Sequence, residues 1–73
     1  MKLITHLAHH RKAAGLTQAE LAQRAGVSRK TINTVENSVF TPSTTLALTL
    51  ALVLGVTVHD LFELDEPDKE NEK

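Results

Sequence analysis

Two segments with strong helix-capping signals are separated by only three residues, and this spacing constrains the fold more than any other feature of the sequence. The first segment begins at Thr17, and Glu20 stands at the spacing of a reciprocal capping box. It ends before Gly26, and Ser28 caps a second segment that is expected to run to about Asn37. So short a connection sets two helices at a steep angle. The two segments are therefore predicted to form one angled helix pair.

The apolar residues of this pair fall where the angled geometry needs them. Those predicted to point into the angle between the helices are Leu21, Ala25, Val27, Ile32 and Val35. Ala22 provides a small side chain where the two backbones approach, and Gly26 takes a positive φ at little energetic cost. The combined spacing of small, glycine and apolar positions is far more specific than any one of them.

Further cap signals predict a helix on the N-terminal side of the pair. Thr5 is expected to cap this first helix, which runs through Ala14. Gly15 is expected to close it in the left-handed conformation that glycine adopts most readily. Leu3 and Leu7 are predicted to face inward.

Two more helices are predicted after the pair. Ser43 caps the fourth helix, which ends at Gly55, although its sequence LALTLALVL also alternates with a period of two, as a strand would. The strand is rejected because leucine and alanine are strong helix formers and because helix caps stand at both ends. Thr57 with Asp60 starts a short fifth helix that ends near Phe62.

These elements predict an all-α fold, a compact five-helix domain over residues 1–64. The chain has 73 residues, of which 41% are apolar but only two are aromatic, so leucine, valine, isoleucine and alanine must build the core. Lys2 to Ile4 and Glu63 to Leu64 are predicted to pair as a short antiparallel β-ribbon that closes the domain. Residues 65–73 have no apolar periodicity and are predicted to form an acidic, disordered tail.

The composition argues against several classes of protein. The absence of cysteine removes disulfides, thiolate metal sites and a cysteine nucleophile, and it fits a reducing compartment, so we expect a cytoplasmic protein. No signal peptide is apparent, and the apolar run from Leu46 to Val58 is shorter than the roughly 20 residues of a membrane-spanning helix, so no membrane partner is expected.

No catalytic or metal-binding constellation is apparent. His6 and His10 are four residues apart on the first helix, but two ligands do not complete a zinc site, so we expect no metal. His59 is expected to face solvent. No nucleophile has a base and an orienting partner, and there is no phosphate-binding loop, so neither an enzyme nor a cofactor is predicted.

The net charge of −1 argues at first against a nucleic-acid partner, because most nucleic-acid-binding proteins carry a basic surface. The charge is unevenly distributed, however. Residues 65–73 hold five acids and two lysines, whereas residues 1–64 hold six basic and four acidic residues. The predicted folded part is therefore mildly basic, and the acidic segment masks it.

The outer face of the third helix carries side chains that suit DNA bases. Lys30, Asn33, Thr34 and Asn37 lie on one stripe, and Arg29 flanks it. Two basic residues at a helix N-terminus are repelled by the positive end of the helix macrodipole, so helix stability does not explain their presence. Arginine and lysine donate to guanine, asparagine pairs with adenine, and the threonine methyl packs on the thymine methyl. The alternative is an ordinary solvated helix face.

The run LTQAELAQRAGVSRKTINTVEN closely resembles the helix-turn-helix family of the Cro and phage-repressor type, also called XRE-like. The likeness covers roughly residues 7–64. It includes Gly26-Val27-Ser28 in the turn, Pro42-Ser43 before the fourth helix and Gly55-Val56 before the fifth.

The resemblance implies a transcriptional regulator that binds double-stranded DNA, usually as a homodimer on an operator of two half-sites. It places the third helix, Arg29 to Asn37, in the major groove. The residues that match base-reading positions are Arg29, Lys30 and Thr34, to which Asn33 is added. The residues at positions where contacts to phosphate or positioning contacts are common are Gln18, Ser28, Asn37 and Thr41. Whether the regulator represses or activates stays open.

The resemblance also implies a structural ion pair. Arg11 and Glu36 match two residues that bridge the first helix and the end of the third helix in family members. Such a pair stabilises the domain and is not counted as a DNA contact.

Three residues depart from the family pattern. Ser38 and Val39 follow Asn37 where the family usually has a glycine and often a basic residue, which puts the phosphate contact of this loop in doubt. His10 stands where leucine is common. Leu52 replaces a polar residue, so the fourth helix is apolar nearly all round.

Surplus apolar residues on the fourth helix predict a homodimer interface, because an exposed apolar helix surface on so small a domain is typical of a contact surface. The interface is expected to use some of Leu48, Leu52, Leu61, Phe62 and Leu64. The alternative is that these residues only fill the core.

A second function stays open beside the regulator. The chain could act as the antitoxin of a toxin pair, or as another protein-interaction module, with the acidic tail folding on a protein partner. Such antitoxins usually bind DNA as well, so the two readings overlap.

Overall fold

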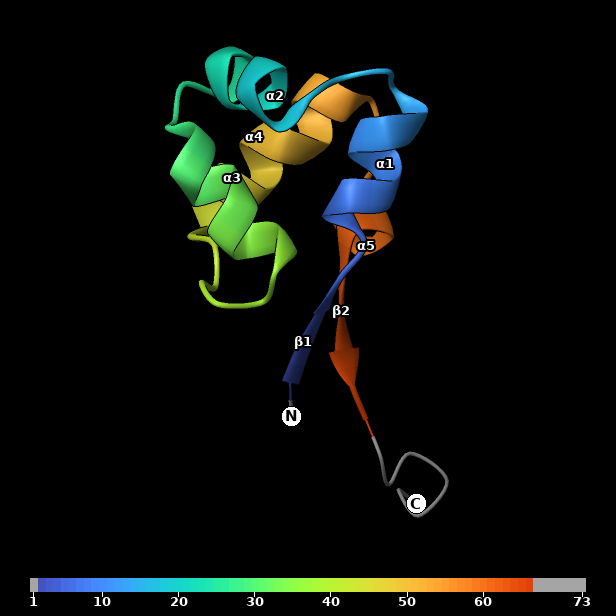
Figure 1. The fold of residues 1–73 in the computed structure, drawn as a ribbon. Coiled ribbons are helices and arrows are strands. Elements are labelled where there is room, and N and C mark those ends of the chain that lie inside the picture. Colours follow the sequence, from blue (N-terminus) through green and yellow to red (C-terminus); the bar gives the residue numbers. More distant parts are fainter. Residues whose placement is uncertain (1, 67–73) are drawn as a thin grey trace.

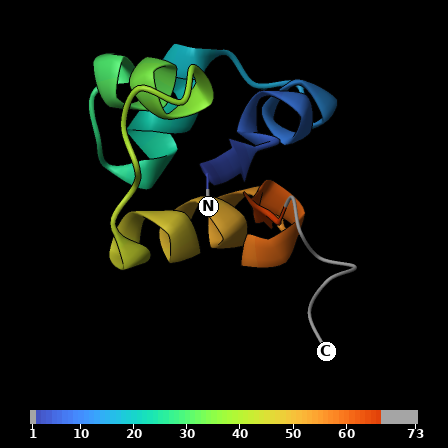
Figure 2. The ribbon, with the colours of Figure 1, turned by 90° about the horizontal axis from the view of Figure 1, so that it is seen from below.

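Helix caps set the ends of the elements in the computed structural model, which describes residues 2–66 (Figure 1). The elements in chain order are β1 (Lys2–Thr5), α1 (Leu7–Ala13), α2 (Gln18–Ala25), α3 (Arg29–Glu36), α4 (Thr44–Leu54), α5 (Val58–Leu61) and β2 (Phe62–Asp65). The predicted five-helix fold with a terminal β-ribbon is confirmed for these residues. Seen from below, α4 and α5 form one layer, and α1, α2 and α3 lie across it (Figure 2).

The predicted caps of α2 and α3 are present. Thr17 N donates to the Glu20 carboxylate over 2.8 Å, and Glu20 N donates to the Thr17 hydroxyl over 3.1 Å. The backbone hydrogen bond from Thr17 holds the pKa of Glu20 below its usual value. Gly26 takes a positive φ of 76°, and the Ser28 hydroxyl accepts from Thr31 N over 3.1 Å. Local hydrogen bonds therefore fix both helix ends at the turn.

Helices α4 and α5 begin and end as predicted. Ser43 Oγ accepts from Leu46 N over 3.1 Å, and Gly55 closes α4 with a φ of 69°. Thr57 and Asp60 form the reciprocal capping box of α5, with bonds of 2.9 Å and 3.0 Å. The backbone bond from Thr57 lowers the pKa of Asp60.

The predicted start of α1 is wrong. Thr5 lies in β1 and pairs with Phe62 of β2, and α1 begins at Leu7 with His6 at its N-cap. His6 N donates to Leu61 O over 2.7 Å, so pairing with the C-terminal segment extends the strand into residues that local cap rules assign to the helix. Thr5 Oγ1 still accepts from Leu7 N over 3.2 Å.

The two ends of the domain meet in the antiparallel β1–β2 ribbon, which projects from the helices (Figure 1). It is longer than predicted, since it takes in Asp65, which pairs with Lys2. Asp65 therefore belongs to β2 rather than to the predicted tail. Residues 67–73 of that tail lie outside the described residues. His6 Nε2 lies 2.6 Å from Glu63 Oε2 and ties the ribbon to the start of α1.

Every helix contributes to one apolar core. The fully buried side chains are Leu7, Leu21, Ile32, Val35, Leu50 and Leu61. Of the residues predicted to point into the angle between α2 and α3, Leu21, Ile32 and Val35 are buried, while Ala25 and Val27 pack at its edge. Helix propensity alone does not hold helices this short, so the shared core is the main source of their stability.

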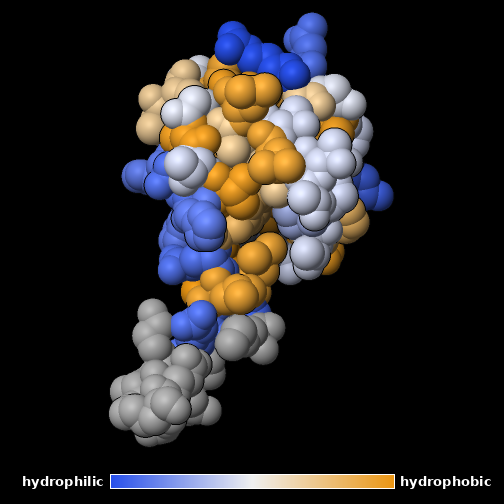
Figure 3. Space-filling view, turned by 180° about the vertical axis from the view of Figure 1, so that it is seen from behind, coloured by the Kyte–Doolittle hydropathy of each residue, from blue (hydrophilic) through white to orange (hydrophobic). Residues whose placement is uncertain are grey.

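The outer face of α4 remains exposed. Leu48 is 57% exposed and Leu52 is 83% exposed, and Leu64 of β2 is also exposed. Figure 3 shows apolar side chains gathered in a band over this side of the molecule that continues toward the ribbon. Leu61 and Phe62, two of the five candidates for the dimer interface, are buried in the core of the chain. None of the helices between residues 2 and 66 has the length and apolar content to cross a membrane.

The loop between α3 and α4 folds back onto α3. Ser38 takes a φ of 61°, where the related family usually has glycine, and it is the one non-glycine residue with positive φ in the described part of the chain. Val39 N and Phe40 N both donate to Thr34 O, over 2.9 Å and 3.2 Å. Two backbone bonds to one carbonyl therefore anchor the loop to the last turn of α3.

Replacing Ser38 by glycine is expected to raise the free energy of unfolding by about 0.5–1 kcal/mol, because a side chain with a Cβ is strained at positive φ. Urea denaturation of both proteins measures the change. The matched control is Gly55→Ala, where φ is 69° and no atom lies within 4 Å of an added Cβ. This control is expected to lose about 1 kcal/mol. A loss of stability in Ser38→Gly would contradict the assignment of strain to this residue.

Candidate nucleic-acid interface

The outer face of α3 presents a row of polar and basic side chains to solvent. Arg29, Lys30, Asn33 and Asn37 are exposed, and Thr34 is half-buried. The Thr34 hydroxyl donates to Thr31 O over 3.0 Å within the helix. Its methyl group is therefore the part of the side chain that is available for an outside contact.

The N-terminal end of α3 is positively charged and carries no acid in its first turn. Arg29 and Lys30 add two cations to the positive end of the helix macrodipole. In the part of the chain that the structure describes, the two salt bridges are His6–Glu63 and Arg11–Glu36, so neither cation is paired there. These positive charges are therefore available to attract an anionic ligand.

Asn33 and Asn37 are ordered by each other. Asn37 Nδ2 donates to Asn33 Oδ1 over 3.2 Å, one turn apart on the exposed face. Each amide keeps hydrogen-bonding groups that face outward, since a side-chain amide has two donors and a carbonyl oxygen with two lone pairs. The bond limits the rotamers of both side chains before any ligand arrives.

Gln18 joins this face from the start of α2. It lines a shallow polar hollow together with Arg29, Lys30 and Asn33. Its amide nitrogen donates to Glu36 Oε1 over 2.9 Å, a bond that the sequence does not reveal. Gln18 is therefore held beside the α3 face by a carboxylate at the far end of α3.

A buried ion pair fixes the position of α3. Arg11 of α1 is only 9% exposed, and its Nε and Nη2 donate to the two oxygens of Glu36, over 2.6 Å and 3.2 Å. The hydrogen bond to Glu36 raises the pKa of Arg11. Nη1 donates to Leu16 O over 2.9 Å. One guanidinium therefore joins α1, the connection before α2 and the end of α3.

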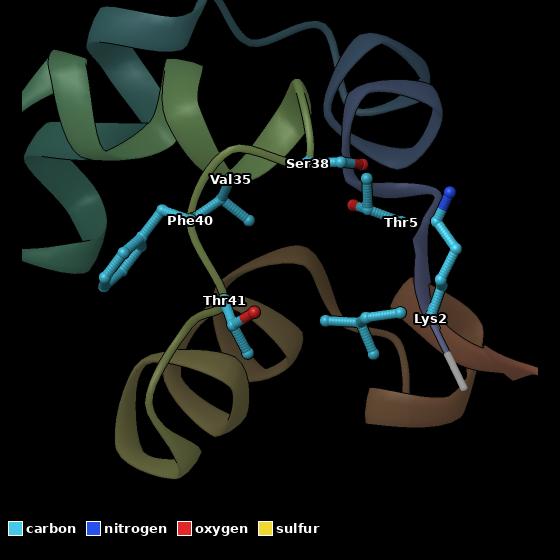
Figure 4. Close-up of a pocket in the computed structure, with 7 residues that line it drawn as sticks. Lys2, Thr5, Val35, Ser38, Phe40 and Thr41 are labelled. Carbon is cyan, nitrogen blue, oxygen red and sulfur yellow. The ribbon is translucent and has the colours of Figure 1, made fainter.

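The remaining two predicted positioning residues lie apart from each other. Ser28 is exposed at the start of α3, where its hydroxyl caps the helix and lies 3.0 Å from the Thr31 hydroxyl. Thr41 lies in the next loop and lines a hollow between that loop and β1 (Figure 4). The other residues labelled around this hollow are Lys2, Thr5, Val35, Ser38 and Phe40. The structure therefore brings Ser28, but not Thr41, to the α3 face.

A second hollow flanks α3, and it is not evident from the sequence. It is lined by Ser28, Lys30, Thr31, Thr34, Val39 and Phe40. Its only signal in the sequence is Val39, which stands where the family resemblance leads us to expect a basic residue. Among residues 2–66, no group of three or more histidine, aspartate or glutamate side chains is placed to hold a metal ion.

The angled pair of α2 and α3, the three-residue turn between them and the polar face of α3 define a helix-turn-helix protein. The family model described as "Helix-turn-helix" matches residues 7–61. The chain is 48% identical over 63 residues to an HTH-type transcriptional regulator of Methanothermobacter thermautotrophicus, covering 85% of this chain and 91% of that protein. The chain therefore belongs to the XRE-type helix-turn-helix family of DNA-binding transcriptional regulators.

Solved structures share the fold. The clp gene regulator ClgR from Corynebacterium glutamicum matches with a TM-score of 0.70 and 30% identity over 74% of this chain, which spans 57% of the ClgR chain. The master regulator for biofilm formation SinR, in complex with DNA, matches with a TM-score of 0.69 and 31% identity over 73% of this chain and 86% of SinR.

Replacing Arg11 by methionine is expected to lower the free energy of unfolding by about 3–5 kcal/mol, because Glu36 would stay buried without its cation. Urea denaturation measures the loss. The matched control is Glu63→Gln, which removes the solvent-exposed pair with His6 and should cost no more than about 1 kcal/mol. Losses of equal size in the two variants would contradict the special role of the buried pair.

Proposed function

We propose that this chain binds a specific double-stranded DNA operator by inserting α3 into the major groove. The observation that carries this proposal is the exposed, basic and acid-free face of α3, which a buried ion pair holds in place. An α-helix fits the width of the major groove, and the first turns of a recognition helix are the part that reaches base edges. Arg29 and Lys30 stand in that first turn.

Each base-reading side chain has a distinct chemical role. Arg29 and Lys30 donate to O6 and N7 of guanine. Asn33 pairs with N6 and N7 of adenine, and its bond to Asn37 orders it for this contact. The Thr34 methyl packs on a thymine methyl, because its hydroxyl is already bonded within the helix.

Gln18, Ser28 and Asn37 position the protein on the phosphate backbone. All three lie at the margins of the α3 face, and contacts there set register without reading sequence. Thr41 is assigned a weaker role, since the hollows that it lines contain none of the proposed base-reading residues.

The protein acts as a homodimer on two half-sites in this proposal. Leu48 lines a mainly apolar groove, and Leu64 lines a second groove that also contains His59 and Glu63. The two grooves share Leu3, Val58 and Phe62 as lining residues, and Leu52 extends the apolar surface along α4. A second copy of this face would cover the apolar band visible in Figure 3. A two-fold dimer matches an operator whose half-sites lie about one helical turn apart. Occupation of such an operator regulates transcription.

A protein partner is the competing occupant of the same apolar face. In an antitoxin-like role, a different protein chain would cover Leu48 and Leu52. Most of the acidic segment that would fold on such a partner lies outside the described residues. The oligomeric state of the purified chain distinguishes the two.

Operator binding tests the role of α3. A duplex selected from a randomised pool by the wild-type chain is titrated with Arg29→Ala and Lys30→Ala, each of which is expected to bind about tenfold or more weakly, because each removes a contact to a base edge. Arg24→Ala is the matched control: it removes an exposed cation of α2 that lines neither hollow, and is expected to bind within about twofold of wild type. Equal losses in all three variants would show that only general charge matters.

Sedimentation of the purified chain tests the dimer. Wild type is expected to sediment as a dimer, and Leu52→Glu is expected to dissociate it, because a charge would be buried in the apolar interface. The matched control is Val39→Glu, at a residue of similar exposure that lines a hollow with α3 residues. A wild-type monomer, both free and on the operator, would refute the homodimer and favour a partner of another kind.

A further inference from the structure

Two large apolar side chains are exposed directly beside the face of α3. Val39 is 76% exposed and Phe40 is 49% exposed. They line one hollow together with Lys30 and Thr34, two of the proposed base-reading residues. Exposing such groups to water does not stabilise the fold. Their presence is explained if another molecule covers them in a complex.

The position of this loop relative to α3 is fixed. Val39 N and Phe40 N share the Thr34 carbonyl as acceptor, and Ser38 N donates to Val35 O over 3.1 Å. A ligand that meets Thr34 therefore meets the two apolar residues at a defined offset. Phe40 also lines the hollow on the β1 side, and in Figure 4 its ring points away from Lys2 and Thr5.

Lys30 places this hollow at the edge of the proposed DNA surface, because it also lines the polar hollow formed with Gln18 and Asn33. The face of α3 is thus flanked by a polar hollow on one side and an apolar hollow on the other. No carboxylate lines either hollow. Neither hollow therefore presents a negative charge to DNA.

The chemistry of the loop selects one part of the DNA. Valine and phenylalanine side chains offer no donor to a phosphate oxygen, so the phosphate contact that a basic loop would make is absent. The apolar group that bases present in the major groove is the C5-methyl of thymine.

We propose that Val39 and Phe40 form an apolar pocket wall that recognises the methyl group of a thymine at the edge of each half-site. This inference rests on the proposed insertion of α3 into the major groove and deepens it. It adds a specificity determinant outside α3, and the Thr34 methyl contacts a separate base closer to the centre of that face.

A uracil scan tests the proposal, because uracil in place of thymine removes only the C5-methyl. Each thymine of the selected operator is replaced in turn, and each duplex is titrated with wild type and with the double variant Val39→Ala, Phe40→Ala. At one or two positions uracil is expected to weaken wild-type binding about three- to fivefold, the effect of one buried methyl group. The double variant is expected to lose that sensitivity and to bind both duplexes equally.

Thr34→Ser provides the matched control, since it removes a methyl and keeps the hydroxyl. It is expected to lose sensitivity to uracil at a different position and to keep the position that depends on the loop. Urea denaturation verifies that all variants are folded, which their surface positions favour.

Two failures are distinguishable. If wild type binds its selected operator specifically but the double variant shows the same uracil profile as wild type, the inference is overturned while the proposed function stands. If wild type binds selected and shuffled duplexes equally, the proposed function fails and the inference fails with it.

Discussion

The buried contact between Arg11 and Glu36 determines how the rest of the molecule is arranged. A charged pair taken out of water is tolerated only when its geometry is good and its remaining donors are satisfied. Here the guanidinium also bonds Leu16 O, and Gln18 bonds the same carboxylate. The network joins α1, the start of α2 and the end of α3, so the angle between the two helices of the motif is set by polar contacts as well as by the core.

This arrangement separates the molecule into two surfaces with different chemistry. One surface, on α3 and the loop that follows it, is basic and polar at its centre and apolar at its edge. The other, on α4 and the ribbon, is apolar and exposed. The inner face of α4 packs against α2, and its outer face is exposed. A partner bound to that outer face leaves the face of α3 free. A dimer can therefore form without covering the surface that is proposed to contact DNA.

The sequence predicts what local chemistry decides and misses what distant contacts decide. The caps at Thr17, Ser28, Ser43 and Thr57 depend on residues three positions away, and all four are present. Thr5 fails as a cap because its strand pairs with Phe62, more than fifty residues along the chain. The exposure of each leucine depends likewise on tertiary packing. Leu48 and Leu52 are exposed as expected, whereas Leu61 is buried, and no local pattern distinguishes them. The apolar hollow beside α3 could not be predicted, because it forms only when the loop after α3 folds back onto that helix.

Mapping the contact surface by NMR tests the central claim that α3 is the face presented to DNA. The isotope-labelled chain is titrated with the selected operator and with a shuffled duplex of equal length. On the operator alone, the largest shifts are predicted for Arg29, Lys30, Asn33 and Thr34, with intermolecular contacts from these side chains to base edges. Large shifts confined to the outer face of α4, with the signals of α3 unchanged, would contradict the claim.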